Sequence, residues 1–283
     1  MKTIDTNNID TPSLHKYLLG AIGPRPIAFA STLDKKGNPN LSPFSFFNVF
    51  SANPPILIFS PARSGITGKN KNTLENVKEV PEVVINVVNY NIVQQMSLSS
   101  APYEKGVNEF LKSGLTMLDS EVVKPFRVKE SPVHLECKVL EIKELGNKGG
   151  AGNLVICEVL KIHINEAVLD KDGFIDQQKI DLVARMGGNW YCRTDANSMF
   201  EIPKPIVSIG VGVDTLPDNI LNDKHLSGND LGILGSAERL PSYEESIDYV
   251  NIKGIKPDEK YEKVKALLKD NNPIDALKVL TAL

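Results

Sequence analysis

The sequence has few cysteines and no long apolar run, and both absences exclude large classes of protein. Its three cysteines, Cys137, Cys157 and Cys192, are too widely spaced for a Cys-x-x-Cys or zinc pattern and do not suit a disulfide framework. We therefore expect a reducing compartment and a cytoplasmic location. No window approaches the roughly 18 uninterrupted apolar residues of a membrane span. The N-terminal sequence MKTIDTNNIDTPSLHKY also lacks the apolar core of a signal peptide.

The charge balance and the histidines exclude two further classes. The 32 basic and 35 acidic residues give a net charge of -3, so no basic face is implied and nucleic acid is not an expected partner. The histidines are scattered, so no metal site is expected: His15, His134, His163 and His225. No Ser-His-Asp order, close carboxylate pair or Cys-His pair lies near the motifs described below. If the protein is an enzyme, a cofactor is therefore expected to carry the chemistry, and no catalytic side chain is predicted.

Hydrophobic periodicity predicts a mainly β domain. Apolar or alternating runs typical of strands occur at residues 26–32, 41–50, 56–60 and 83–88. Thr73 is expected to N-cap a short helix, and residues 91–113 to contain two more. Six or more strands with short connections favour a closed antiparallel barrel over a parallel α/β sheet.

Two longer alternating runs, residues 133–145 and 153–166, flank the segment GNKGGAG and predict a long β-hairpin. The glycine-rich segment could be a phosphate-binding loop, but it does not have the spacing of either common phosphate motif. We therefore interpret residues 146–152 as the hairpin turn.

The composition changes near Pro205, where the chain becomes glycine-rich, then polar, then helical. Tyr261, Val264, Leu267 and Leu268 lie on one face of a predicted helix, and a second amphipathic helix follows Asn272 and Pro273. We expect a domain over residues 1–204 and an appended C-terminal extension with a helical tail over residues 205–283, without a core of its own.

Three segments carry candidate binding features. In SPFSFFNVFS, residues 42–51, aromatic rings alternate with hydroxyls and an amide, as in the wall of a site for a planar polar heterocycle; a core strand is the alternative. GKNKNTLENV, residues 68–77, sets lysines before a helix start, which suits an anion; an N-cap with solvated lysines is the alternative. In ARMGGNWYCR, residues 184–193, the glycine pair lets the backbone pass close to another segment; a turn with an aromatic lid over the core is the alternative.

The segments GPRPIAFASTLDKKGNPNLSPFSFFNVFSANPPILIFS, KNTLENV, SPVHLECKV and ARMGGNWYCR together resemble the flavin reductase-like FMN-binding split-barrel family, and within it the longer, flavoredoxin-like members. The resemblance covers about residues 15–204. It implies a Greek-key split barrel, a homodimer, and FMN bound without a covalent link near the subunit interface. It also implies reduction of flavin by NADH or NADPH, or electron transfer through bound flavin to a redox partner protein.

The resemblance also implies which residues bind the cofactor. By position, residues 45–48 match the segment that lines the isoalloxazine, Lys71 and Thr73 match the phosphate segment, and Asn72 replaces the Asp of the family there. Arg185 stands where other branches have His. The candidate FMN contacts are Arg25, Ser31, Thr32, Ser45, Phe46, Phe47, Asn48, Ser51, Lys71, Asn72, Thr73, Asn189 and Trp190.

The resulting hypothesis is an NAD(P)H-dependent flavin oxidoreductase, in which positioning of nicotinamide over flavin is sufficient and no acid or base is needed. One alternative is a flavoredoxin-type electron carrier that NAD(P)H does not reduce directly. Another is a non-catalytic module that binds flavin or another ligand.

Overall fold

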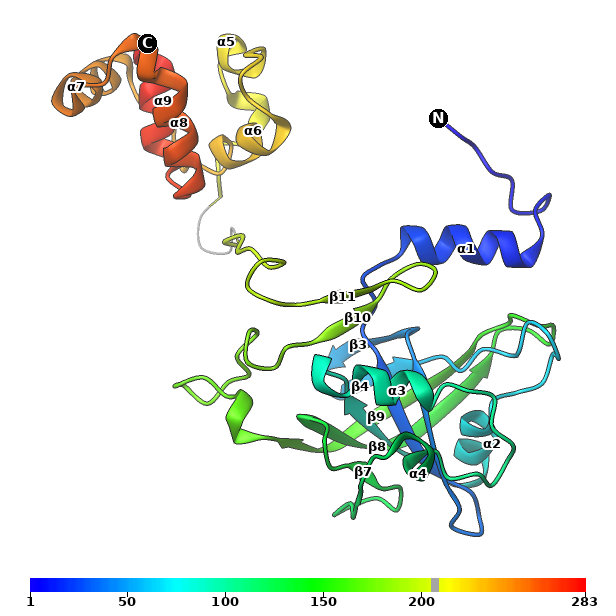
Figure 1. Ribbon diagram of the computed structural model, residues 1–283. Coiled ribbons are helices and arrows are strands. Elements are labelled where there is room, and N and C mark those ends of the chain that lie inside the picture. The colour runs from blue at the N-terminus through cyan, green and yellow to red at the C-terminus, as the bar shows by residue number, and fades with distance from the viewer. Residues whose placement is uncertain (205–208) are drawn as a thin grey trace. The chain divides into compact units, whose positions relative to one another are not determined.

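The computed structural model describes residues 1–204 and 209–283, and the chain divides into two compact units, Met1–Phe200 and Glu201–Leu283 (Figure 1). The start of the predicted C-terminal extension, residues 205–208, lies outside the described residues. None of the described helices is both long and apolar enough to cross a membrane.

The first unit is built on a seven-stranded antiparallel sheet with the order β2-β1-β5-β8-β9-β4-β3. Only Ser45 and Phe46 separate β2 from β3 along the chain, although these strands lie at opposite ends of the sheet order. The sheet must therefore curl until its two edges meet at this link, which makes a barrel with an unpaired seam. The predicted mainly β, Greek-key split barrel with short helices is confirmed. The strands are β1 (Ala28–Leu33), β2 (Pro39–Phe44), β3 (Phe47–Ala52), β4 (Pro55–Phe59), β5 (Glu82–Val87), β8 (Val133–Glu144) and β9 (Asn153–Ile164).

The barrel interior is apolar and is closed by a short helix. Ala28 and Ala30 of β1, with Phe59 of β4, are fully buried in it. Leu74 and Val77 of α2 (Asn72–Glu79) enter the same cluster. The expected N-cap at Thr73 is wrong, because the helix begins at Asn72, Lys71 occupies the N-cap position, and Thr73 is buried within the first turn.

The opposite face of β1 and β2 packs against a second apolar cluster that contains Phe29, Leu41 and Phe110. The helices α3 (Val93–Leu98) and α4 (Glu109–Ser113) contribute to this cluster, and they confirm the two helices expected within residues 91–113. The remaining elements of this unit are α1 (Thr11–Ala21), β6 (Met117–Leu118), β7 (Arg127–Val128), β10 (Val183–Arg185), β11 (Tyr191–Arg193) and two 3-10 helices, Tyr90–Ile92 and Glu166–Val168.

Strands β8 and β9 form the predicted long hairpin, so the interpretation of GNKGGAG as its turn is confirmed. The turn packs against the loop after β4: the Arg63 amide donates to the Ala151 carbonyl at 2.9 Å, and the Gly150 amide donates to the Arg63 carbonyl at 3.1 Å. A Cβ atom at Gly149 would lie 3.0 Å from the carbonyl oxygen of Ser64. The glycines therefore permit close contact between two backbone segments.

The second unit consists of helices around a core of its own, so the expectation that the extension lacks a core is wrong. Val264, Leu267 and Leu268 are buried there and Tyr261 packs against them, as the helical periodicity predicted. Asn272 caps the last helix by accepting from the Asp275 amide. The helices are α5 (Asp218–Leu221), α6 (Gly228–Leu234), α7 (Tyr243–Lys253), α8 (Lys260–Lys269) and α9 (Pro273–Ala282), with 3-10 helices at Val213–Thr215 and Pro257–Glu259.

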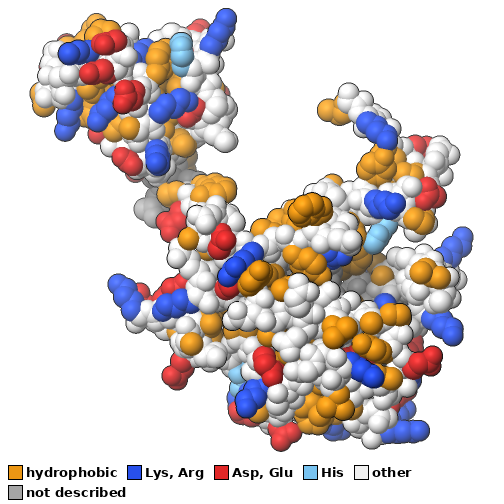
Figure 2. Space-filling model, viewed as in Figure 1, with side chains coloured by type: hydrophobic (Ala, Val, Ile, Leu, Met, Phe, Trp, Pro, Cys, Tyr) orange, Lys and Arg blue, Asp and Glu red, His pale blue; other side chains and the backbone are white. Residues whose placement is uncertain are grey.

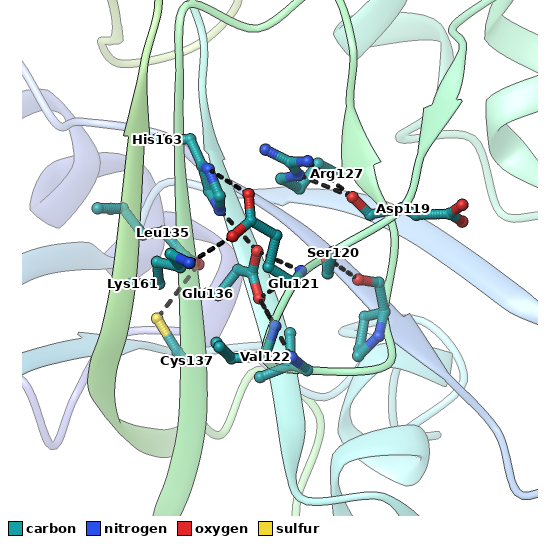
Figure 3. Close-up of polar contacts among 12 residues, drawn as sticks. Asp119, Ser120, Glu121, Val122, Arg127, Leu135, Glu136, Cys137, Lys161 and His163 are labelled. Carbon is teal, nitrogen blue, oxygen red and sulfur yellow. Dashed lines mark hydrogen bonds and ion pairs between the residues drawn. The ribbon is translucent and has the colours of Figure 1, made fainter.

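A buried carboxylate ties the loop between β6 and β7 to the barrel (Figure 3). Glu136 of β8 accepts hydrogen bonds from the successive backbone amides of Glu121, Val122 and Val123 at 2.7–3.1 Å. Nε2 of His163 lies 2.7 Å from the same carboxylate. The Glu136 side chain is fully buried, so these contacts replace the water that the charge loses.

Replacing Glu136 with Gln should lower the free energy of unfolding by about 1–3 kcal/mol at neutral pH, because the new amide group would face backbone donors. Glu121→Gln is the control, since that side chain is half exposed and bonds to Lys161. Urea unfolding followed by circular dichroism measures the difference, and equal effects of the two substitutions would contradict the assignment.

The effect should also depend on pH. Burial acts to raise the pKa of Glu136, but the three amides and His163 outweigh it and hold this pKa below its ordinary value of 4.5. The stabilisation is therefore complete above about pH 4.5 and is lost as the pH falls through the folded-state pKa. Wild type and Glu136→Gln should converge in stability on acidification.

Candidate functional site

A groove lies where β2 passes into β3, at the seam of the barrel. It consists of two hollows that share Pro43, Phe44, Ser45 and Ser100. The first hollow adds residues from α1, from the loop after β4 and from the start of α2: His15, Leu19, Ser42, Phe46, Ser60, Ala62 and Lys71. The second adds Ile27, Met96, Arg185 and Tyr191. Ser45 therefore stands at the middle of a continuous surface.

The aromatic residues of the SPFSFFNVFS segment divide between the core and the groove. Phe44 is buried in the barrel interior and Phe47 packs against it. Phe46 is 39% exposed and lines the first hollow, where its ring meets that of His15 edge-on at 6.3 Å. The core-strand interpretation therefore holds for Phe44 and Phe47, whereas Phe46 belongs to the link between β2 and β3. Its place in the wall of a heterocycle site stays a prediction.

One end of the groove is suited to an anion. Lys71 is exposed, lines the first hollow and has no acidic partner among residues 1–204 and 209–283. It directly precedes α2, and the backbone amides of Asn72 and Thr73 donate to no acceptor in the described part of the chain. Free amides and the helix dipole therefore act together with the ammonium group. The Asn72 side chain is half-buried and lies 3.5 Å from the Tyr103 carbonyl.

A buried polar network supports this helix start from below. The Asn40 side-chain amide donates to the Thr73 hydroxyl at 2.9 Å and to the Thr32 hydroxyl at 3.3 Å, and Asn76 donates to Thr32 at 3.2 Å. Thr32 and Thr73 are 0% and 1% exposed. Both hydroxyls therefore support the start of the helix and line neither hollow, and their predicted contact with the cofactor stays a prediction.

Ser31, another predicted cofactor contact, also lies away from the groove. Ser31 is fully buried within the sheet, paired with Leu41 of β2 and Val84 of β5. Its hydroxyl has no hydrogen-bond partner in the described structure, but it lines neither hollow.

Arg25 does not contact the groove as expected but holds its walls together. Its guanidinium donates to the carbonyls of Leu19 at 3.0 Å, Met186 at 2.8 Å and Ile22. Its Nε lies 3.5 Å from the Ser45 hydroxyl. Arg25 is 6% exposed, so its donors are used within the protein and it positions Ser45 from behind.

The ARMGGNWYCR segment forms the β10–β11 hairpin, whose loop packs against α1. A Cβ atom at Gly187 would lie 3.1 Å from the Cα of Gly20, so the glycine pair permits a close backbone approach, as predicted. The aromatic-lid alternative is wrong, because Trp190 is 77% exposed. Trp190 lines a separate open hollow with Lys16 and residues 186–188, whereas Asn189 is exposed and lines none of these hollows.

Asn48 and Ser51 are the other predicted contacts that lie away from the groove. Asn48 is exposed on β3, the last strand of the sheet, and its side chain accepts from the Val49 amide at 2.8 Å. The Ser51 hydroxyl accepts from the Asn53 amide at 3.3 Å. Neither residue lines the two hollows, and a register shift between Val49 and Ser51 interrupts the strand after Asn48.

Sequence reasoning missed several groove residues. His15 and Leu19 belong to α1, a helix whose N-cap Asp10 and early Pro12 were visible in the sequence. Ser100 follows α3 and reaches Ser45 only through the tertiary fold. No local pattern marks such a residue.

The thiols are poorly suited to carry chemistry here. Burial raises the pKa of Cys157 to about 12 and raises that of Cys137 well above its ordinary value. Neither residue lines the groove. What the groove offers is an aromatic wall, serine hydroxyls and cations at Lys71 and Arg185, which suits a planar anionic ligand with polar edges.

The chain is similar to one family model and to proteins of several organisms. Residues 21–180 match the model of the flavin reductase like domain. The protein BH2278 of Halalkalibacterium halodurans is 34% identical over 207 residues, which cover 72% of this chain and 97% of that protein.

Three solved structures are similar to this chain. Nitrilotriacetate monooxygenase component B from Bacillus cereus is 30% identical with a TM-score of 0.67, covering 71% of this chain and 98% of its own. A Shewanella frigidimarina protein assigned as a flavin reductase with split barrel domain is 30% identical with a TM-score of 0.60, covering 70% and 95%. Flavoredoxin of Desulfovibrio vulgaris, at 19% identity and a TM-score of 0.55 over 66% and 93%, shares the fold alone.

Gly187 and Gly20 provide a matched test of how the hairpin loop is held. Gly187→Ala should loosen the loop from α1, because the added methyl group would meet the Gly20 backbone. Gly20→Ala meets nothing within 4 Å and should leave the contact intact, with a helix-propensity gain of at most about 1 kcal/mol. Amide hydrogen exchange over residues 11–22 and 186–191 measures the loosening. Unchanged exchange in Gly187→Ala would show that the close approach does not hold the loop.

Proposed function

Because this chain belongs to the flavin reductase-like family, we propose that it binds FMN in the Ser45 groove and catalyses reduction of this flavin by NADH or NADPH. The observation that carries the proposal is the joining of three features in one groove: the exposed Phe46 ring, the Ser45 hydroxyl and the cationic helix start at Lys71. An isoalloxazine ring needs a flat apolar wall and polar contacts at its edge, and the phosphate of FMN needs a cation and free donors.

The residues present fit FMN on structural grounds. The amides of Asn72 and Thr73 have no acceptor among the described residues, and Lys71 beside them has no acid. A phosphate would satisfy all three groups at once. At the other end of the first hollow, Ser45 and Ser42 present hydroxyls and Phe46 presents its ring.

Each of these residues has a definite task in the proposed reaction. Lys71 and the first amides of α2 bind the phosphate, and Phe46 and His15 bound the ring site. Ser45, held by Arg25, donates a hydrogen bond to a ring edge and thereby tunes the electron affinity of the flavin. When bound, FMN supplies hydride and electron-transfer chemistry. The protein contributes orientation and exclusion of water, and no side chain needs to move a proton.

We further propose that two copies of the chain form a homodimer. The helix α1 buries no residue; its Tyr17 and Leu18, and Ile22 directly after it, are 45–63% exposed. On β3, Val49 and Phe50 are 64% and 62% exposed. Figure 2 shows hydrophobic side chains on the face where α1 and the β10–β11 hairpin of this unit lie. Exposed apolar surface of this kind is typical of an interface between subunits.

The function is tested by identifying the cofactor and then its reductant. The purified protein should contain FMN, identified after release by acid and chromatography. Rapid mixing with NADH or NADPH should bleach the flavin absorbance within seconds. A flavin-loaded protein that neither nucleotide reduces would favour an electron carrier that needs a redox partner protein. A protein that binds no flavin at all would exclude the proposal.

Lys71→Ala should weaken FMN binding at least tenfold and leave riboflavin binding nearly unchanged, because riboflavin lacks the phosphate. Lys69→Ala is the control, since that lysine lies two residues earlier and lines neither hollow. Calorimetric titration of both flavins into the deflavinated protein gives the ratio. Equal losses for the two flavins would remove Lys71 from the phosphate site.

The proposed homodimer is tested by measuring the mass of the protein in solution. Sedimentation equilibrium at micromolar concentration should give twice the chain mass of 31.1 kDa, and replacing Val49 and Phe50 together by Ser should shift the protein towards monomer. A flavin-loaded wild-type monomer would contradict the proposal.

A further inference from the structure

Arg185 is an unpaired cation at the second hollow of the groove. It ends β10, is half-buried, and packs its guanidinium 4.6 Å from the centre of the Tyr191 ring. Its only side-chain hydrogen bond in the described structure is to the Trp190 carbonyl, at 3.3 Å. No acidic side chain pairs with it among residues 1–204 and 209–283.

The neighbouring Arg193 shows what an arginine with a structural role looks like in the same hairpin. Its Nε and Nη2 donate to the two carboxylate oxygens of Asp181 at 2.7 and 2.8 Å. It also lies 3.8 Å over the Tyr90 ring. Arg193 is therefore neutralised within the fold, whereas Arg185 is not.

A second uncompensated cation adjoins Arg185. The backbones of Arg25 and Arg185 exchange two hydrogen bonds, at 3.0 and 2.8 Å. Burial, and then the charge of Arg185, lower the pKa of Arg25 below its ordinary value. Arg25 and Arg185 pair directly across an antiparallel bridge, so their side chains leave the same face, and Arg25 donates only to carbonyl oxygens and a hydroxyl. An oxyanion beside Arg185 would relieve this repulsion.

The second hollow has room and partners for such a group. Arg185 shares it with Ser45, Ser100 and Tyr191, which add hydroxyl donors to the guanidinium. Lys71 lines only the first hollow and Arg185 only the second, and the two hollows meet at Ser45 and Phe44. The groove therefore has one cation at each end of a shared centre.

We propose that Arg185 forms an oxyanion subsite for the substrate that reacts with the flavin, separate from the phosphate site of the flavin itself. The inference rests on the proposed function, which places the flavin ring at the shared centre. The oxyanion is a phosphate of the nicotinamide donor or a carboxylate of an electron acceptor; both offer paired oxygens to the fork of an arginine.

Binding is tested without turnover. Inorganic pyrophosphate and benzoate are titrated calorimetrically into the flavin-loaded wild type, Arg185→Gln and the control Arg193→Gln. At least one anion should bind wild type and Arg193→Gln alike and bind Arg185→Gln at least tenfold more weakly. If Arg185→Gln loses binding of pyrophosphate alone, the subsite takes a phosphate. If it loses binding of benzoate alone, the subsite takes a carboxylate. Equal binding to wild type and Arg185→Gln, or no binding to wild type, overturns the subsite.

Steady-state kinetics then distinguish a failure of the Arg185 subsite from a failure of the proposed reduction by NADH. If the donor phosphate is the ligand, Arg185→Gln should raise the KM for NADH at least tenfold while the rate with uncharged 1-benzyl-1,4-dihydronicotinamide changes less than twofold. If NADH fails to reduce wild type, the proposed donor is wrong, but the anion titrations still decide the subsite. A selective loss of FMN over riboflavin in Arg185→Gln would assign Arg185 to the flavin phosphate and overturn the proposal. Arg185→Lys, which keeps the charge, serves as the second variant if Arg185→Gln does not fold.

Discussion

The buried guanidinium of Arg25 is the contact on which the groove depends. A charge removed from water is costly unless polar groups replace its hydration, and here the carbonyls of Leu19, Ile22 and Met186 do so. These carbonyls belong to the end of α1 and to the loop after β10, which are far apart in sequence. One cation therefore fixes two walls of the groove and stands behind Ser45 on the third. The close backbone approach of Gly187 to Gly20 lies at the same junction.

The two ends of the groove are supported in different ways. The start of α2 lies over the amide and hydroxyl network of Asn40, Thr32, Thr73 and Asn76, whose members are all buried. This network fixes the start of the helix beside Lys71, which lines the first hollow, while its own hydroxyls stay buried. The Arg185 end is held by the three-residue β10–β11 pairing, by two backbone hydrogen bonds to Arg25 and by the ring of Tyr191.

The sequence predicts the barrel well because strand alternation and the long hairpin are local signals. Phe44 could be placed in the core for the same reason, whereas Ser45 and Phe46 lie in the link between β2 and β3, where the period of two no longer applies. The resemblance, not the strand pattern, assigned Ser31, Thr32, Asn48 and Ser51 to the cofactor, and a resemblance in sequence does not show what covers each face. Ser31 and Thr32 are buried, and Asn48 and Ser51 lie on the end strand β3, outside both hollows. Ser100 and His15 arrive through tertiary packing alone.

The proposed reaction brings two anionic molecules into one groove, and the charge arrangement supports that proposal. The chain carries a net charge of -3, yet both cations of the groove, Lys71 and Arg185, lack acidic partners in the described structure. Hydride transfer between two bound rings requires apolar contact at the centre, where charges would have to be desolvated, and anchoring of the charged groups away from it. The groove meets both requirements because its shared centre is Phe44 and Ser45, whereas its cations stand at separate ends. Lys71, beside the free amides of the helix, offers a point charge that suits a terminal phosphate. The planar guanidinium of Arg185 stacks on the Tyr191 ring, which keeps its N–H donors in one plane. Under the proposed function, this division assigns the flavin phosphate to the Lys71 end and the second substrate to the Arg185 end.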